Sequence, residues 1–181
     1  SSSIKLEVFA VPALQSIAEA LLEKIGTPEA RLRQRRFGSD GGTRDEMHSR
    51  PVADHQAGFD FIIEVNARDR VIREASEVAA IGHRVVHGGE RFAAPTLIDD
   101  GVVDAIRELI PLAPLHNPSN LLGIEAARQR FPHAKHVAVF DTAFPQSIPP
   151  HAYRYAVPNE LYEQHQVRRY GFHGSSHAYV A

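Results

Sequence analysis

The sequence contains no cysteine among its 181 residues. Disulfide bonds and zinc sites with cysteine ligands are therefore excluded. The sequence shows no apolar run long enough to cross a bilayer and no recognisable signal peptide, so we expect a cytoplasmic protein without membrane contact. The formal net charge is −2, which provides no excess of basic residues for binding nucleic acid.

Lysine is scarce as well, with three lysines against seventeen arginines. Where arginine is the usual cation, a lysine marks a position that needs a compact point charge, such as a phosphate contact. Lys5 follows three serines in the opening "SSSIK", and serine hydroxyls with turn amides could complete an anion nest. Serine-rich chain ends also occur without such a role. The chain lacks an initiating methionine and stops at "HAYVA", inside a predicted helix, so we expect it to be incomplete at both ends.

The pattern of apolar residues predicts alternating strands and helices. Strands are predicted over residues 4–10, 78–89 and 136–141. Helical spacing or propensity predicts helices over 14–26, 54–66, 99–113, 117–131, 159–165 and 174–181. Candidate helix caps are Asn117, with Pro118 at the first helical position, and Ser175 or Ser176. Polar, glycine-rich residues 36–51 predict a loop or hairpin tip. The alternation indicates an α/β fold.

Histidines form two pairs with a spacing of four residues, His83 with His87 and His173 with His177. That spacing binds zinc when both residues lie on one helix. In the predicted strand "GHRVVHGG", residues four apart are about 13 Å from each other, and the sequence has no HExxH motif. The pattern therefore disfavours a metal site built from these histidines.

Arg84 lies near the end of the same predicted strand. By alternation, Arg84 and Val86 share the face opposite His83 and His87. Side chains at the carboxyl end of such a strand face the crevice where α/β folds bind ligands. A guanidinium binds a carboxylate or phosphate through two hydrogen bonds, and Val86 would supply an apolar wall. The alternative is an ion pair between Arg84 and a nearby acid such as Glu90.

Two further residues are candidates by position. Asp141 ends the apolar strand "HVAVFD", where a catalytic or ion-orienting carboxylate is common. The alternative is an aspartate that caps a turn. His116 stands between prolines in "APLHNP", before a predicted helix, and either contacts an anion or locks the loop through a hydrogen bond.

Five motifs together resemble the acetate kinase family, the short-chain acid kinases of the acetate and sugar kinase/Hsc70/actin superfamily. They are "SSSIK", "GHRVVHGGE", "PLAPLHNP", "VAVFDTAFPQSIPP" and "RRYGFHGSSH", in the family's order. The resemblance covers residues 1–10 and nearly all of 78–181, and separates acetate from propionate kinases poorly. It implies the N-terminal domain of the ribonuclease H-like α/β fold. Residues 1–141 would form most of the acid-binding domain without its first strand, and residues 142–181 would lead into a nucleotide-binding domain.

The resemblance implies a binding site for a short carboxylate. Arg84 matches the arginine that binds the substrate carboxylate, and Val86, Leu115 and Phe172 match positions of its small apolar pocket. His116 matches a histidine near the path of the phosphoryl group.

The resemblance also implies groups for phosphoryl transfer. Asp141 matches the catalytic aspartate, and His173 matches the histidine that stabilises the transition state. Ser1, Ser3 and Lys5 fall in the hairpin that binds the nucleotide phosphates. Acetate is already ionised at neutral pH and needs no general base. We therefore expect Asp141 to orient an arginine or a magnesium-bound water rather than to accept a proton.

The implied reaction is reversible transfer of a phosphoryl group from ATP, with Mg²⁺, to acetate, by a protein that is a homodimer at full length. The family's magnesium-binding residues and its second catalytic arginine fall outside this chain, so we expect no metal ligand here and no activity from the chain alone. Three alternatives stay open: a propionate or butyrate kinase, a non-catalytic module that binds carboxylate or phosphate, and a histidine-rich metallohydrolase.

Overall fold

The computed structural model describes residues 2–181, which divide into two compact units. The first unit comprises the chain up to residue 79 together with residues 122–134, and the second comprises residues 80–121 and 135–181. The chain thus leaves the first unit, returns to it and leaves it again. The domain boundary that we predict at residue 141 concerns the longer family members and stays a prediction.

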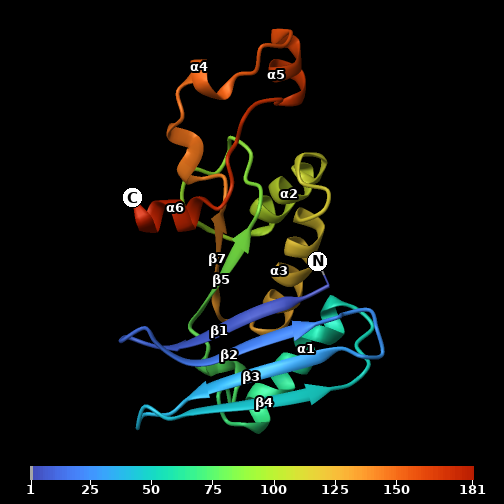
Figure 1. Ribbon diagram of the computed structural model, residues 1–181, viewed down its shortest axis with the longest axis vertical. Coiled ribbons are helices and arrows are strands. Elements are labelled where there is room, and N and C mark those ends of the chain that lie inside the picture. Colours follow the sequence, from blue (N-terminus) through green and yellow to red (C-terminus); the bar gives the residue numbers. More distant parts are fainter. Residues whose placement is uncertain (1) are drawn as a thin grey trace. The chain divides into compact units, whose positions relative to one another are not determined.

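The first unit is built on an antiparallel four-stranded sheet with strand order β1-β2-β3-β4. The strands are β1 (Ile4–Ala10), β2 (Gln15–Glu23), β3 (Arg31–Phe37) and β4 (Thr43–Ser49). Figure 1 shows α1 (His55–Arg68) lying along one face of this sheet. A short 3₁₀ helix, η1 (Ala75–Glu77), follows. The predicted strand over 4–10 and the predicted helix over 54–66 are confirmed.

The core of the first unit lies between the sheet and α1. Leu22 and Leu32 from the sheet pack in one cluster with Ile62 from the helix. At Gly58, a Cβ would lie 2.8 Å from the Leu22 side chain, so a larger residue would force core side chains to shift. The side chain of Asp54 caps α1 by accepting the N–H of Ala57 at 2.8 Å.

The predicted helix over residues 14–26 is wrong, because β2 occupies most of that segment. Ala and Leu favour helix, but Ala18, Ala20 and Leu22 alternate inward while Glu19 and Glu23 stay nearer the solvent. This period of two fits a strand, and pairing with β1 and β3 on both sides outweighs the local propensity. The predicted loop over 36–51 shrinks to residues 38–42 for the same reason, since β3 and β4 pair over their whole length.

The second unit contains a three-stranded sheet with order β5-β7-β6. Its strands are β5 (Ala80–Val85), β6 (Thr96–Leu97) and β7 (Lys135–Phe140). Figure 1 shows β5 and β7 running in the same direction, with α6 near their carboxyl ends. In register, Val85 pairs with Phe140, so the residues that follow both strands meet at one edge. The strands predicted over 78–89 and 136–141 are confirmed in position.

Seven short helices accompany this sheet. They are α2 (Asp100–Glu108), η2 (Ile110–Leu112), α3 (Asn117–Arg130), η3 (Phe144–Ser147), α4 (Pro150–Tyr153), α5 (Asn159–His165) and α6 (Gly174–Val180). The second half of α3 belongs to the first unit, where Phe131 meets Phe59 edge to face at 6.3 Å. The predicted helices over 99–113, 117–131, 159–165 and 174–181 are confirmed, the first of them as α2 and η2.

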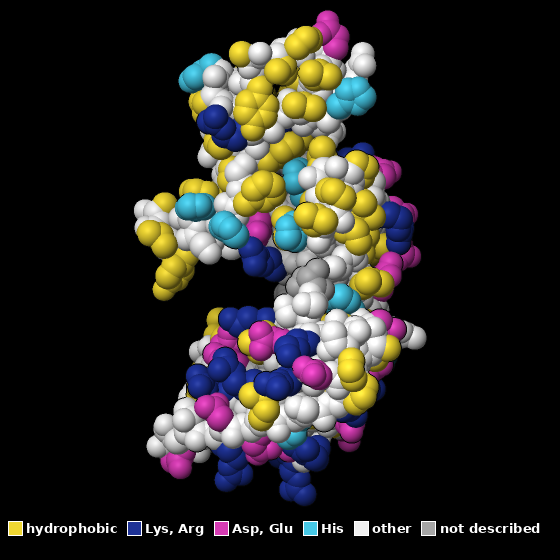
Figure 2. Space-filling model, turned by 45° about the vertical axis from the view of Figure 1, so that its right-hand side comes forward, with side chains coloured by type: hydrophobic (Ala, Val, Ile, Leu, Met, Phe, Trp, Pro, Cys, Tyr) yellow, Lys and Arg dark blue, Asp and Glu magenta, His cyan; other side chains and the backbone are white. Residues whose placement is uncertain are grey.

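The surface of the first unit carries charges of both signs. Figure 2 shows Lys and Arg side chains interspersed with Asp and Glu side chains there. On the sheet, Arg35 donates two hydrogen bonds to Asp45, at 2.7 and 3.0 Å. Among the described residues, every helix is too short or too polar to span a bilayer.

Candidate active site

Arg84 and Asp141 meet where β5 and β7 end. Arg84 lies opposite Val139 in the parallel register, so it shares a face with Asp141 two residues further on. The Arg84 Nε donates to Oδ1 of Asp141 at 2.9 Å, and its Nη2 donates to Oδ2 at 2.7 Å. The Asp141 side chain is 2% exposed and that of Arg84 is 62% exposed. The hydrogen bonds that Arg84 donates to Asp141 raise the pKa of Arg84, so the guanidinium is permanently charged.

The alternative ion pair between Arg84 and Glu90 does not form. Glu90 accepts instead from Arg168 and from the Tyr162 hydroxyl, the latter at 3.1 Å. The acid near Arg84 in the sequence is therefore not its partner, and the buried Asp141, 57 residues away, takes that place.

His173 joins the pair from the far end of the sequence. Its Nδ1 lies 3.1 Å from Nη2 of Arg84, which can only donate, so Nδ1 accepts and the ring proton is on Nε2. The backbone of His173 is left-handed, with φ of 57°, and the next residue donates its N–H to the carbonyl of Asp141 at 2.8 Å. The caps predicted at Ser175 or Ser176 are wrong, because His173 occupies the N-cap position of α6. A Cβ at Gly174 would collide with that carbonyl, which fixes glycine at this start of the helix.

The contacts with Asp141 and His173 fix the orientation of the Arg84 guanidinium and leave some of its N–H donors unused. Of the five N–H groups of Arg84, two donate to Asp141 and one to His173. Within the described residues this leaves the two N–H groups of Nη1 for an anion from the solvent side. A buried carboxylate on one side thus holds an exposed guanidinium in an orientation that suits an anion.

The loop of residues 86–89, which follows β5, is held by side chains. Its four backbone N–H groups donate to side-chain acceptors at 2.9–3.2 Å. The acceptors, taken in order from residue 86 to residue 89, are Asn120, Asn117, Thr142 and His87. Asn117, which the sequence suggests as a helix cap, thus directs its side chain to the backbone of His87. None of these four residues was assigned to the site from the sequence, although Asn117 belongs to the "PLAPLHNP" motif and Asn120 follows it by two residues.

Two of the predicted pocket residues, Val86 and Phe172, belong to this loop or lie close to it. Val86 is half-buried, and its N–H is the one bound by Asn120. Phe172 is 46% exposed, and its ring lies 5.9 Å from that of His87. Leu115 and His116 are exposed in the turn between η2 and α3. The structure thus joins Arg84, Asp141 and His173 directly, whereas Leu115 and His116 are not in their hydrogen-bond network.

A second cluster missed by sequence reasoning anchors the segment that leads to His173. Arg168 is buried, and its guanidinium lies over the ring of Tyr153, at 3.6 Å from the centroid, and beside Tyr170 at 5.1 Å. It pairs with Glu90, which follows the loop after β5. The "RRYGFHGSSH" motif contains this arginine, but its partner could not be read from the sequence.

The nucleotide-binding prediction falls in the first unit. Ser1 lies outside the described residues, while Ser3 and Lys5 are exposed around the start of β1, where Lys5 pairs with Leu21. Their assignment to the phosphates of ATP stays a prediction.

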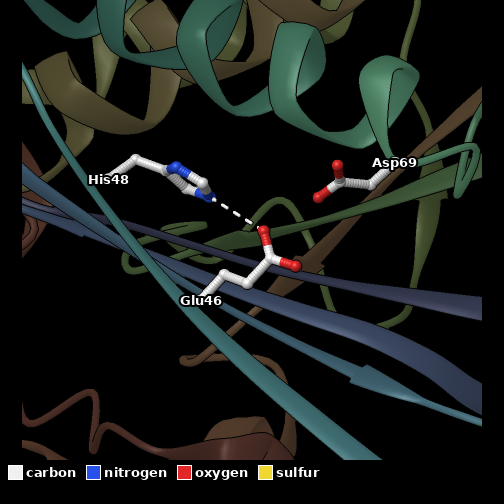
Figure 3. A group of neighbouring side chains, drawn as sticks. All are labelled: Glu46, His48 and Asp69. Atoms are coloured by element: carbon white, nitrogen blue, oxygen red, sulfur yellow. Dashed lines mark ion pairs between the residues drawn. The ribbon is translucent and has the colours of Figure 1, made fainter.

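One group of potential metal ligands occurs among the described residues, and it does not include the predicted histidine pairs. Figure 3 shows Glu46 and His48 from β4 beside Asp69, with ligand atoms within 4.8 Å of one another. Arg68 approaches Glu46 at 3.3 Å and Asp69 at 2.8 Å, and Arg36 contacts both acids too. The hydrogen bond from Arg68 lowers the pKa of Asp69. Two arginines already neutralise the carboxylates, so the cluster is a surface ion-pair network rather than a cation site.

Comparison with known proteins gives one consistent result. The sequence is 54% identical over 183 residues to an acetate kinase from Syntrophobacter fumaroxidans, covering the whole chain and 44% of that protein. A crystal structure of Porphyromonas gingivalis acetate kinase matches with a TM-score of 0.89 and 41% identity, over 99% of this chain and 45% of that one. A propionate kinase from Francisella tularensis matches with a TM-score of 0.87 and 35% identity, over 99% and 44%.

These structures confirm the predicted fold, the N-terminal domain of the acetate and sugar kinase/Hsc70/actin class. The chain spans about 45% of the length of these relatives and corresponds to their N-terminal portion. A sequence model described as the Acetokinase family matches residues 1–181 in full. The chain therefore belongs to the acetokinase family.

Proposed function

We propose that this chain supplies the carboxylate-binding half of an acetate kinase site, which transfers a phosphoryl group from ATP to acetate and forms acetyl phosphate and ADP. The observation that supports this most directly is the exposed guanidinium of Arg84, oriented by the buried carboxylate of Asp141 and contacted by His173. Relatives named acetate kinase, at up to 54% identity, favour acetate as the acceptor.

The difficulty of this reaction is to bring one anion to another. Acetate has a pKa of about 4–5 and is ionised at neutral pH, so its oxygen can attack the γ-phosphorus without a base. Arg84 binds the acetate carboxylate through Nη1 and reduces its repulsion from the phosphates. The bond from the γ-phosphorus to the ADP oxygen breaks as the new bond forms, and charge spreads over the phosphoryl oxygens. The Nε2–H of His173 can donate to one of them.

Asp141 acts in this scheme as a positioning residue. Both of its oxygens accept from Arg84, so it keeps the guanidinium in one orientation and is not the acceptor of a substrate proton. The same two bonds make Asp141 a poor direct ligand for Mg²⁺, which would accompany ATP and supply charge neutralisation at the phosphates. We therefore assign no magnesium ligand to this chain.

The remaining predicted residues complete the proposal. Val86, Leu115 and Phe172 would line the pocket for the acid's methyl group, and His116 would lie near the phosphoryl path. Ser1, Ser3 and Lys5 would contact the phosphates of ATP. A propionate kinase is the second candidate, because the Francisella tularensis propionate kinase has a closely similar structure. Location in the cytoplasm and a homodimer at full length belong to the same proposal.

The test uses a completed chain, in which the Syntrophobacter fumaroxidans enzyme supplies the parts that residues 1–181 do not cover. We expect acetyl phosphate, detected as the hydroxamate, from the completed chain and none from residues 1–181 alone. Several electrostatic groups are missing from the chain alone, and each is worth about 10²–10³ in turnover.

Substitution of Arg84 then tests the site itself. Arg84→Ala in the completed chain should lower kcat/KM for acetate about thirty- to a thousand-fold, because it removes the charge-assisted contact to the acetate carboxylate. The matched control is Arg107→Ala, which removes an exposed arginine paired with Asp104 on α2 and should leave activity unchanged. Equal activity of Arg84→Ala and Arg107→Ala would remove Arg84 from the site.

A further inference from the structure

His87 is a buried polar residue that the proposed reaction does not use. It is 2% exposed, and Asn117 binds both its N–H, at 3.2 Å, and its carbonyl, at 3.1 Å. Its Nδ1 accepts the N–H of Gly89 at 3.0 Å, so the ring is neutral with its proton on Nε2. Burial agrees with this state, because it lowers the pKa of His87 to about 4. The side chain therefore serves as an acceptor that fixes the turn after the strand.

The ring of His87 also contacts the aromatic segment that leads to His173. It meets the ring of Tyr170 edge to face at 4.4 Å and that of Phe172 at 5.9 Å, both at 67°. Such aromatic contacts prefer defined geometry and resist displacement. Phe172 directly precedes His173, and His87 directly follows Val86. One side chain thus connects the loop that carries Val86 to the segment that carries Phe172 and His173.

His83, which is half-buried, has different contacts. Burial also lowers the pKa of His83 to about 4, but its ring stacks on His136 with centroids 5.3 Å apart. Its Nε2 lies 3.0 Å from Nδ1 of that residue, which is on the neighbouring strand β7. His83 therefore contacts another strand of the sheet, whereas His87 contacts the loop and the aromatic segment of the site.

We propose that His87 is a specificity-determining positioning residue, which sets the place of the Phe172 wall relative to Val86 and thereby the size of the acid that the pocket accepts. This inference rests on the proposed function. Neither a phenyl nor an amide would perform both tasks of the imidazole. A phenyl ring would keep the wall but leave the Gly89 N–H without its acceptor, and an amide would keep the acceptor but remove the ring.

Two variants of the completed chain separate these tasks. His87→Asn places an amide oxygen where Nδ1 stands and removes the ring, while His87→Phe keeps a ring and removes the acceptor. For His87→Asn we expect kcat/KM for propionate relative to acetate to rise about tenfold, the lower range of what one methylene is worth in an apolar pocket. For His87→Phe we expect kcat/KM to fall about tenfold for both acids, with their ratio within about twofold of the wild type.

The control is His83→Asn, which removes a half-buried histidine that contacts β7 and should leave the acid ratio unchanged. His87→Gln, closer in volume to histidine, replaces His87→Asn if the latter does not give folded protein. An unchanged acid ratio in the ring-free variant, or an equal change in His87→Phe, would overturn the inference while leaving the proposed function intact. A completed wild-type chain that forms no acyl phosphate from either acid would instead overturn the proposed function, and the inference with it.

Discussion

Removing Arg84 from the Arg84–Asp141 ion pair should destabilise the protein more than removing the charge of Asp141. Arg84→Met deletes the charge but keeps most of the aliphatic stem, and it leaves the Asp141 carboxylate 2% exposed without its cation. Asp141→Asn leaves the guanidinium without its anion, but this group is 62% exposed and water can solvate it. The difference in exposure, rather than the geometry of the bonds, decides the outcome.

The magnitudes follow from that difference. Removing one partner of a fully buried pair costs about 3–5 kcal/mol because a buried charge is left uncompensated. The carboxylate is buried, so Arg84→Met should lower the free energy of unfolding by about 3 kcal/mol. For Asp141→Asn the loss is that of hydrogen bonds to a solvated group, about 1 kcal/mol. The double variant should cost less than the sum of the two, with a coupling energy of about 1–2 kcal/mol.

The positions of the tyrosines allow the unfolding of the second unit to be followed separately. All five tyrosines, at positions 153, 155, 162, 170 and 179, lie in the second unit, and the chain has no tryptophan. Tyrosine fluorescence during urea unfolding of residues 1–181 therefore reports the stability of the unit that contains the ion pair. If Asp141→Asn proves as destabilising as Arg84→Met, or if the two effects simply add, the account of a buried anion held by an exposed cation is wrong.

Three further predictions use the same unit. Gly174→Ala should destabilise it by about 1–3 kcal/mol in urea unfolding, because the new Cβ collides with the Asp141 carbonyl; Gly82→Ala, with nothing within 4 Å, is the control and should cost nothing. His83 and His87 have pKa values of about 4 when folded against about 6.5 when unfolded, so the unfolded chain binds protons first and stability falls as the pH drops from 6.5 to 4. The loss is at most about 3 kcal/mol for each histidine, and tyrosine-detected unfolding that is flat over this range would contradict it. In the completed chain, Val86→Ala should shift preference toward propionate by about tenfold, and an unchanged acetate-to-propionate ratio would show that the pocket has been misplaced.

The sequence predicted the fold class and the ends of the two site strands well, for a physical reason. Arg84 and Asp141 stand at the ends of β-branched or apolar runs. Such runs predict buried strands, because the period of a strand is a local property of the sequence. The helix predicted over 14–26 failed because its residues have high helix propensity, while its pairing with two neighbouring strands is a property of the whole sheet.

The partners of the site residues were beyond sequence reasoning. The sequence predicts Arg84 as an anion-binding residue, which stays a prediction. Glu90, six positions away, was the local candidate for its partner, and the partner in the structure lies 57 positions away. The sequence predicts Asn117 as a helix cap, because a local pattern takes into account only the neighbouring residues along the chain. Its bonds to His87 depend on how α3 packs against the loop after β5, which no local pattern contains.

The separation of the site residues along the chain also sets the order in which the protein can assemble. The four strands of the first sheet are joined by short connections, so their hairpins can form while the chain is still being synthesised. The contact between Arg84 and His173 joins residues 89 positions apart, and such distant contacts carry a larger entropic cost before they form. Residues 122–134 return to the first unit only after β5 and α2 have been made. A nascent chain therefore displays Arg84 before Asp141 and His173 have been made. The last residue of the first unit, residue 134, is synthesised before the β7 strand and the helices that complete the second unit.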